Sequence, residues 1–288
     1  MQRLAFGLTF RLLALLVPVT VPACAQSWPQ HTVKVLVTLG AGSGVDIGAR
    51  LLAERLSKHW GQPVVVENRP GGDGLVAIGA FVAANDDHVL LTAPSGSFTA
   101  HPFTYKSLPY KDADIVPIAR ISNTIVVVAV PASLAAASLA GLAISKVPYR
   151  NLVEAANDLS TGRIQINVTA YAIARPQIEA GKVKLLALTN TARAAVIPDL
   201  PTVAEASFPE LTLDGLVGMF GPRSMSGRVR EGIPADVRAA MDRDVEERLN
   251  LTGQLPNFGG PAEFAADIAQ QRARLATAAK SLGIVPGE

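Results

Sequence analysis

Short apolar, β-branched runs alternate with amphipathic stretches along most of this chain. Apolar runs lie at 33–38, 63–66 and 89–92, and the stretches at 46–60 and 74–84 carry apolar residues three and four positions apart. Short apolar runs are typical of buried strands, and apolar residues three and four positions apart are typical of helices that bury one face. The pattern therefore predicts three strands separated by two helices in the first third of the chain.

The alternation continues to the end of the chain. The same two patterns predict strands at 125–130, 164–168, 183–189 and 211–220, and helices at 152–159, 175–180 and 261–282. Strands that alternate with helices indicate an α/β fold in which helices cover parallel or mixed sheets. Ligands of such folds bind at the carboxyl ends of the strands, which directs attention to the loops found there.

One uncharged stretch, 122–145, has the length of a membrane span. Pro131 interrupts this stretch, residues 125–130 have the β-branched pattern of a strand, and alanine dominates the remainder. We therefore expect a buried strand followed by a short helix in place of a membrane span.

The loop after the first predicted strand is rich in glycine and ends in an acid. Gly40, Gly42 and Gly44 can place backbone N–H groups against a ligand, and Asp46 is expected to cap the helix at 46–60. N–H groups at a helix start hold an anion without a basic side chain. The sequence therefore predicts an anion site that would suit a dinucleotide phosphate or a small carboxylate. It also leaves open that Asp46 only caps the helix and takes no part in binding.

The first 25 residues have the features of a secretory signal peptide. A basic start is followed by an apolar stretch at 12–21, which is too short to span a bilayer, and by the small-residue cleavage site ACA at 23–25. We therefore expect residues 1–25 to be removed and the protein to be periplasmic. A lipid anchor on Cys24 is the less favoured alternative, because the residues before it match a lipobox only loosely.

The composition limits the partners of the mature chain. The whole chain has 26 basic and 24 acidic residues, and the leader carries two of the basic ones, so the remainder has no net charge. Such a chain is a poor binder of nucleic acid. Cys24 is the only cysteine, so a mature chain without it would have neither a disulfide nor a thiol.

Two other interpretations of the same residues are less favoured. The order of strand, glycine loop, helix, strand and then Glu67 is that of a dinucleotide site, but Val45 stands where the third glycine of GxGxxG belongs. An exported protein would also meet little nicotinamide cofactor. The four histidines lie in no catalytic or metal-binding signature, so we expect no enzyme activity, no cofactor and no bound metal.

Several longer motifs carry a family resemblance. They are VVVENRPGGDG at 64–74, LTAPSGSFTAHPFTYKSLPY at 91–110, KVPYRN at 146–151, EAGKVKLLALTN at 179–190 and IPDLPTVAEASFP at 197–209. With the glycine loop through Asp46 and Arg50, they make the chain resemble the substrate-binding proteins of tripartite tricarboxylate transporters, the Bug or TctC family. The resemblance covers nearly the whole mature chain.

The resemblance implies a two-lobed fold like that of type II periplasmic binding proteins, with α/β lobes and a ligand cleft between them. It implies an extracytoplasmic receptor that binds a small organic carboxylate and delivers it to a membrane permease of one large and one small subunit. The receptor is expected to be a monomer. A solute-sensing accessory protein, a degenerate paralogue and an exported enzyme remain as alternatives.

The resemblance also implies a set of ligand-binding residues from both lobes. They are Gly42, Ser43, Gly44, Asp46, Ser95, Gly96, Ser97, Tyr149 and Thr169. The first loop would hold one carboxylate, largely through water. Tyr149 could instead belong to the core, and Thr169 stands where relatives often have an aspartate. A ligand amine would lack that acidic partner, so an amino acid is a less expected ligand.

The resemblance further implies how the chain divides into lobes. A leader at 1–25 would precede a first lobe at 26–122 and 222–288 and a second lobe at 123–221, with hinge strands near 125–130 and 213–220. The second lobe departs from the family, because a strand and a helix are missing near residue 137, about 40 residues if a βαβ unit takes 30 or more. A sheet that loses a strand must expose an edge or close a gap, so we expect this lobe to be less stable than its relatives.

Overall fold

The computed structural model describes residues 28–134, 145, 147, 149, 152–281, 283 and 284. The expected leader at 1–25 and the lipobox before Cys24 lie outside the described residues. So do the short helix expected after Pro131 and the position near 137 at which a strand and a helix are missing. In the part of the chain that is described, no helix combines the length and the apolar character needed to cross a membrane.

A six-stranded mixed sheet forms the larger of two regions. Its strands, in spatial order, are β2 (Val64–Asn68), β1 (Val33–Val37), β3 (Val89–Pro94), β8 (Gly215–Pro222), β4 (Ile115–Thr124) and β9 (Gln254–Gly259). The first three are parallel to one another, and β8, β4 and β9 pair in antiparallel fashion. The carboxyl ends of β1 and β3 are therefore adjacent, and the loops that follow them lie side by side.

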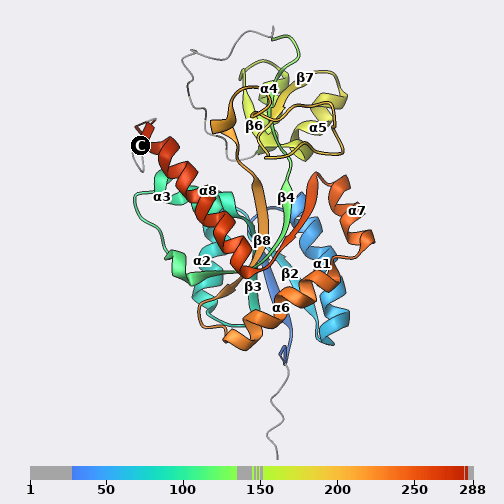
Figure 1. Cartoon of the computed structure of the whole chain (residues 1–288), viewed down its shortest axis with the longest axis vertical. Helices are drawn as coiled ribbons and strands as arrows, with labels where there is room; N and C mark the ends of the chain where they lie inside the picture. Colours follow the sequence, from blue (N-terminus) through green and yellow to red (C-terminus); the bar gives the residue numbers. More distant parts are fainter. Residues whose placement is uncertain are drawn as a thin grey trace, which may run out of the picture.

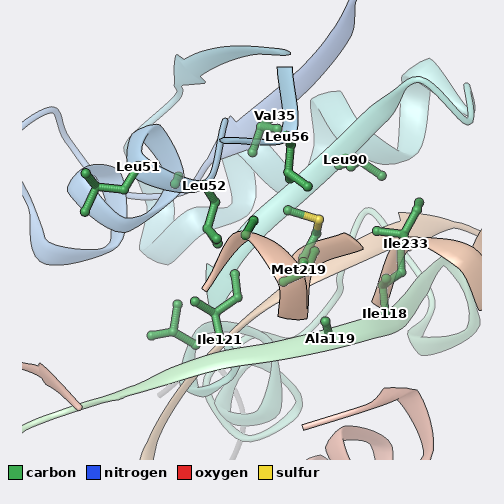
Figure 2. Close-up of a cluster of buried hydrophobic side chains, with 14 of the residues drawn as sticks. Val35, Leu51, Leu52, Leu56, Leu90, Ile118, Ala119, Ile121, Met219 and Ile233 are labelled. Carbon is green, nitrogen blue, oxygen red and sulfur yellow. The ribbon is translucent and has the colours of Figure 1, made fainter. Parts of the chain in front are cut away.

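Six helices cover the two faces of this sheet. They are α1 (Gly44–Trp60), α2 (Leu75–Ala84), α3 (Ser95–Thr104), α6 (Gly227–Ala240), α7 (Arg243–Leu251) and α8 (Pro261–Ser281), with short 3-10 turns at Gly72–Gly74, Asp112–Asp114 and Pro209–Leu211. One core cluster joins one face of the sheet to α1, α6 and α7, and a second joins the other face to α2, α3 and α8. Figure 2 shows Leu52 and Leu56 of α1 pointing toward Met219 of β8 in the first cluster.

A three-stranded antiparallel sheet forms the smaller region, at one end of the molecule (Figure 1). Its strands lie in the order β6 (Asn167–Ala170), β5 (Val126–Pro131) and β7 (Val183–Leu188), with β5 antiparallel to both neighbours. The helices α4 (Leu152–Ser160) and α5 (Tyr171–Glu179) pack on it. Two small apolar clusters, one around Ile125 and one around Leu159, make up its core.

The two regions are joined where β4 runs into β5 and where the segment after β7 returns to β8 (Figure 1). At the first crossing, the N–H of Ile125 donates to Gly253 at 2.9 Å, and its carbonyl accepts from the N–H of Tyr171 at 2.8 Å. At the second crossing, the N–H of Leu213 donates to the carbonyl of Thr189 at 2.8 Å. Backbone hydrogen bonds therefore hold both crossings to the ends of neighbouring elements.

The predicted α/β fold with flanked sheets is confirmed, with corrections to several elements. The strand predicted at 164–168 begins only at Asn167, and the one predicted at 211–220 is β8, Gly215–Pro222. The helix predicted at 175–180 is α5, which begins at Tyr171 and holds Pro176 in its interior. The strand β9 was not predicted, because Pro256 and a shortage of apolar residues hide it.

Candidate functional site

The glycine loop between β1 and α1 is closed by a reciprocal cap. Ser43 is the N-cap of α1, and its Oγ accepts from the N–H of Asp46 at 3.2 Å. The carboxylate of Asp46 in turn accepts from the N–H of Gly42 at 2.8 Å. The prediction that Asp46 caps the helix is therefore corrected: Ser43 holds that position, and Asp46 binds back from the first turn. Gly42 has φ of 83°, a conformation that favours glycine.

Asp46 is buried beneath this loop, at 2% exposure, and donors of its own chain surround it. Besides Gly42, its carboxylate accepts from Nδ2 of Asn68 at 2.8 Å and from Nε of Arg50 at 3.0 Å. Burial by itself would raise the pKa of Asp46, but the three hydrogen bonds outweigh it and hold the pKa below its ordinary value. Asp46 therefore stays ionised and shapes the loop from within.

Asn68 completes the support of the loop. Strand pairing sets Asn68 beside Val37, and its Nδ2 also donates to the carbonyl of Leu39 at 3.0 Å. Its Oδ1 accepts from the guanidinium of Arg50 at 2.8 Å. The structure thus adds Arg50 and Asn68 to the predicted loop residues. In the sequence, Asn68 stood out only as part of the family motif at 64–74, and its contact with Asp46 crosses 22 positions of sequence.

The predicted residues Ser95, Gly96 and Ser97 form a second turn, at the start of α3, and differ in their exposure. Ser95 is fully buried, and its Oγ donates to Oε1 of Gln271 on α8 at 2.6 Å. Gly96 is open, since a Cβ added there would meet no atom within 4 Å, and the same is true of Gly40 and Gly42 in the first loop. Ser97 is partly buried. Ser95 therefore anchors the turn, and Gly96 and Ser97 remain the members that a ligand can reach.

Buried hydroxyl groups without a hydrogen-bond partner lie at the strand ends near these loops. Thr38 follows β1, Thr92 lies in β3, and the Oγ1 atoms of both are buried and unpartnered among the described residues. A Cβ added to Gly74 would lie 3.3 Å from Cβ of Thr38 and 3.5 Å from Cβ of Ser97. Thr38 is therefore close to the second turn, and neither hydroxyl was singled out by sequence reasoning.

The smaller region places its two predicted residues differently. Thr169 lies in β6, is buried, and carries a hydroxyl without a partner in the described part of the chain. Tyr149 donates its hydroxyl to Oδ2 of Asp158 on α4 at 2.9 Å, and burial and this bond raise its pKa. Tyr149 is thus engaged with α4, whereas Thr169 stands just before the first residue of α5.

The segment before β9 brings the starts of α1 and α5 to one place. A Cβ added to Gly44 would lie 3.0 Å from the carbonyl oxygen of Thr252 and 2.8 Å from Nε2 of Gln254. A Cβ added to Gly253 would lie 3.5 Å from the backbone nitrogen of Ala172 in α5. The start of α1, after the glycine loop, and the start of α5, after Thr169, therefore both lie close to residues 252–254.

A separate cavity of about 300 Å³ lies beside the crossings, on the α8 side. Its lining is mostly polar and includes Arg120, Asn123, Asn190, Asp214, Gln271 and Arg274. The nine predicted ligand-binding residues are absent from this lining. The sequence pattern does not predict the cavity, because its walls come from distant segments, mainly β4, the second crossing, β9 and α8.

The described residues offer one group of potential metal ligands, Asp86, Asp87 and His88. Nε2 of His88 accepts from the N–H of Gln30 at 3.1 Å, so the neutral ring carries its proton on Nδ1. That Nδ1 lies 2.7 Å from Oδ1 of Asp87 and donates to it. The nitrogen that faces the two acids is therefore protonated, which does not fit a metal site.

Glu67, the acid of the dinucleotide interpretation, is also engaged. Nε of Arg69 donates to its Oε1 at 2.6 Å, and the ammonium of Lys34 lies 3.7 Å from its Oε2. Two cations thus hold the carboxylate that would have to accept from a ribose hydroxyl. The geometry of the glycine loop therefore supports anion binding through backbone N–H groups.

Known proteins resemble this chain in sequence and in fold. The sequence matches the family model described as "Tripartite tricarboxylate transporter family receptor", TctC, over residues 48–140 and 134–281. A UPF0065 protein of Bordetella bronchiseptica is 30% identical over 275 residues, which cover 83% of this chain and 79% of the relative.

Two solved structures share the fold over nearly their whole length. One, described as a periplasmic transporter, has a TM-score of 0.78 and 27% identity, and covers 90% of this chain and 99% of its own. The other, an R. palustris protein solved with adipate, has a TM-score of 0.79 and 25% identity. This match covers 90% of the present chain and 100% of the R. palustris chain.

Proposed function

Because this chain belongs to the receptor family of tripartite tricarboxylate transporters, TctC, we propose that it binds a small organic carboxylate and delivers it to a membrane transporter of that type. The family is one of solute-binding receptors, and the related solved structures are periplasmic binding proteins. The proposal adds the chemical class of the ligand, the binding residues and the transporter as partner.

One observation carries the proposal: two glycine-containing turns with open backbone lie at the adjacent carboxyl ends of β1 and β3. A Cβ added at Gly40, Gly42 or Gly96 would meet no atom within 4 Å, so a ligand can approach the main chain there. The N–H groups of Gly44 and Val45, the first two residues of α1, have no partner within the helix. They are suited to hold a carboxylate oxygen.

The buried carboxylate of Asp46 favours this role. It draws the N–H of Gly42 inward and fixes the loop through Asn68 and Arg50, so the loop is rigid before a ligand arrives. A loop that is already ordered loses less entropy on binding. Asp46 therefore contributes to affinity by holding the loop. Thr169 on the other region has a hydroxyl without a partner among the described residues, and it can bind the far end of the ligand.

The class of ligand is supported by the R. palustris relative that was solved with adipate, a dicarboxylate. The first turn of α1 carries no basic side chain, and α1 begins at Gly44 with Ser43 as its cap. A site built from N–H groups and hydroxyls can hold a carboxylate without a basic side chain. We therefore propose a small mono-, di- or tricarboxylate as the ligand.

We also propose that the two regions are the lobes of the receptor. The first lobe would hold the six-stranded sheet with its helices, and the second the three-stranded sheet with α4 and α5. The match to the family model runs in two pieces that meet at residues 134–140, which supports a missing strand and helix near 137. Ligand contacts to both lobes would favour the closed form.

Thermal unfolding with a panel of ligands tests the proposal. Mono-, di- and tricarboxylates, aromatic acids and nicotinamide nucleotides are added to the purified chain. A ligand that binds only the native state stabilises it by about 2.7 kcal/mol at a hundredfold excess over its dissociation constant. A rise in the midpoint with one class of acids supports the receptor, and a rise with nucleotides alone contradicts it.

Uptake by cells tests the partnership with a transporter. Cells that lack the gene should lose uptake of the acid found in the panel, and a copy of the gene should restore it. A copy with Gly42→Val, which a φ of 83° disfavours, should fold but fail to restore uptake. Uptake that persists without the gene, with loss of a transcriptional response to the acid, would assign the chain to sensing instead.

A further inference from the structure

Gln271 joins the ligand-binding turn at the start of α3 to the second crossing between the regions. It lies on α8 and is 6% exposed. Its Oε1 accepts from Oγ of Ser95 at 2.6 Å, and its Nε2 donates to the carbonyl of Asp214 at 2.9 Å. Oγ1 of Thr99 lies 3.1 Å from the same Oε1 and 3.0 Å from the carbonyl oxygen of Ser95, so its single proton is shared between these two acceptors. A backbone carbonyl only accepts, so the amide can make all three bonds in this orientation alone.

The contacts continue from Asp214 to the first crossing. The carboxylate of Asp214 accepts from the N–H of Thr191 at 3.0 Å and from its Oγ1 at 2.5 Å. The neighbouring Asn190 accepts from the N–H of Val126 at 2.9 Å and donates to the carbonyl of Thr124 at 2.9 Å. A continuous path of hydrogen bonds therefore leads from the first turn of α3 to both crossings.

The cavity of about 300 Å³ lies beside this path, and Gln271, Asp214 and Asn190 all line it. A side chain next to empty space can move without repacking a dense core, whereas buried apolar contacts resist small shifts. The crossings can therefore take up a second arrangement at this place more easily than at the sheet. Energetic coupling between distant sites needs such a contiguous set of contacts with two arrangements.

We propose that Gln271 is a positioning residue that couples occupancy of the turn at Ser95–Ser97 to the order of the crossing at Leu213–Gly215. The inference rests on the proposed function, since the ligand would be the carboxylate bound at that turn. A ligand that orders the turn would order the crossing through Gln271. By linkage, a change at the crossing would alter the affinity of the turn equally.

Hydrogen exchange with adipate as the probe tests the coupling. In the wild-type chain, saturating adipate should slow exchange at the turn and, about tenfold, at the amides of residues 213–215. In Gln271→Met, which keeps length but loses the hydrogen bonds, protection should persist at the turn and fall below about twofold at the crossing. Gln270→Met changes the exposed glutamine beside it, which lines the same cavity; it controls for a change in the cavity wall and should behave as wild type.

The pattern of outcomes separates the two proposals. Protection of the crossing that survives Gln271→Met would overturn the coupling and leave the receptor intact. If adipate slows exchange at the turn of the wild-type chain but not at the crossing, the coupling is likewise overturned and the receptor proposal stands. If adipate protects neither segment, the failure lies with the proposed ligand, and a ligand-free comparison decides the coupling.

The ligand-free comparison uses Thr99→Val, which removes the hydroxyl shared between Gln271 and the carbonyl of Ser95 and hardly changes the size of the side chain. If Gln271 transmits between the elements, this variant speeds exchange at residues 213–215 without ligand, although Thr99 itself lies on α3. The effect should vanish in the double variant with Gln271→Met, because both changes cut the same path. Additive effects, or an effect confined to α3, would overturn the coupling.

Discussion

The two sheets of this chain bury their side chains to different extents. The six-stranded sheet has helices on both faces, and Phe81, Phe220 and Phe264 are wholly buried against it. The three-stranded sheet is packed by two small clusters of aliphatic residues. Exposed apolar side chains lie on both regions, such as Val168 of β6 at 57% and Leu251 of α7 at 74%, so the regions differ in their cores and not in their surfaces. The larger region thus has the greater share of apolar burial.

This difference has a consequence for ligand binding. The glycine loop lies on the region with the larger core, where hydrogen bonds from Asn68 and Arg50 hold it in place. Thr169 lies on the region with the smaller core, whose sheet has an exposed edge strand. Regions with fewer buried contacts open at lower free energy. We therefore expect the larger region to present a fixed half of the site and the smaller region to supply the adaptable half.

The largest loss of stability is expected from a methyl group added to the larger sheet. A Cβ at Gly218 would clash with the ring of Phe264 and lie 2.6 Å from the carbonyl oxygen of Ala119. Gly218→Ala should therefore lower the free energy of unfolding by about 3 kcal/mol or more, measured by urea titration. Gly232→Ala on α6, where an added Cβ meets nothing within 4 Å, is the control and should not destabilise.

Two leucine truncations compare the regions directly. Leu52→Ala and Leu159→Ala each empty a fully buried site and should lower the free energy of unfolding by about 3 kcal/mol. The truncation in α1 should speed exchange throughout the larger sheet, and the one in α4 should speed exchange at β5, β6 and β7 only. If both variants affected all strands equally, the two regions would form one cooperative unit, contrary to the account.

Asp46→Asn tests the support of the glycine loop. It removes an ionised acceptor from three donors, and we expect a loss of about 2 kcal/mol in the free energy of unfolding near neutral pH. Because the folded pKa lies below the ordinary value of 3.8, wild type loses this stabilisation as the pH falls below 3.8. The difference between the two proteins should therefore shrink in acid, and a constant difference would contradict the assignment.

The smallest change in stability is expected from the two serine caps. Ser43→Ala at α1 and Ser226→Ala at α6 should each lower the free energy of unfolding by about 1 kcal/mol. Only the first lies in the proposed site, so only Ser43→Ala should weaken binding of the acid, as measured by titration calorimetry. If both variants bind the acid with equal affinity, the glycine loop is not part of the binding site.

Local patterns predicted the first loop and most elements around it. The run of strand, glycines and helix at 33–60 is decided by neighbours in sequence, and α1 is found within two residues of its expected start. The prediction that Asp46 is the cap of α1 was wrong, because Ser43 and Asp46 are both residues that favour this position. The carboxylate of Asp46 instead accepts from Gly42 and Asn68, and the latter contact is not visible in the local sequence. The fold class and the family resemblance are confirmed, and the ligand-binding residues stay predictions.

The contacts between distant elements could not be predicted. Ser95 was expected to line the cleft, but its hydroxyl meets Gln271, which is 176 positions away. The cavity at the crossings is formed by segments as far apart as Arg120 and Arg274. A hydrophobic pattern fixes which face of an element is buried, and it does not say which polar side chain of another element meets that face.

A crystal structure of the chain with the best acid from the panel tests the central claim most directly. The account predicts a carboxylate oxygen within hydrogen-bond distance of the N–H of Gly44 or Val45, with the far end of the acid facing Thr169. Density for the acid in the cavity beside Asn190 and Asp214, with the glycine loop unoccupied, would contradict it.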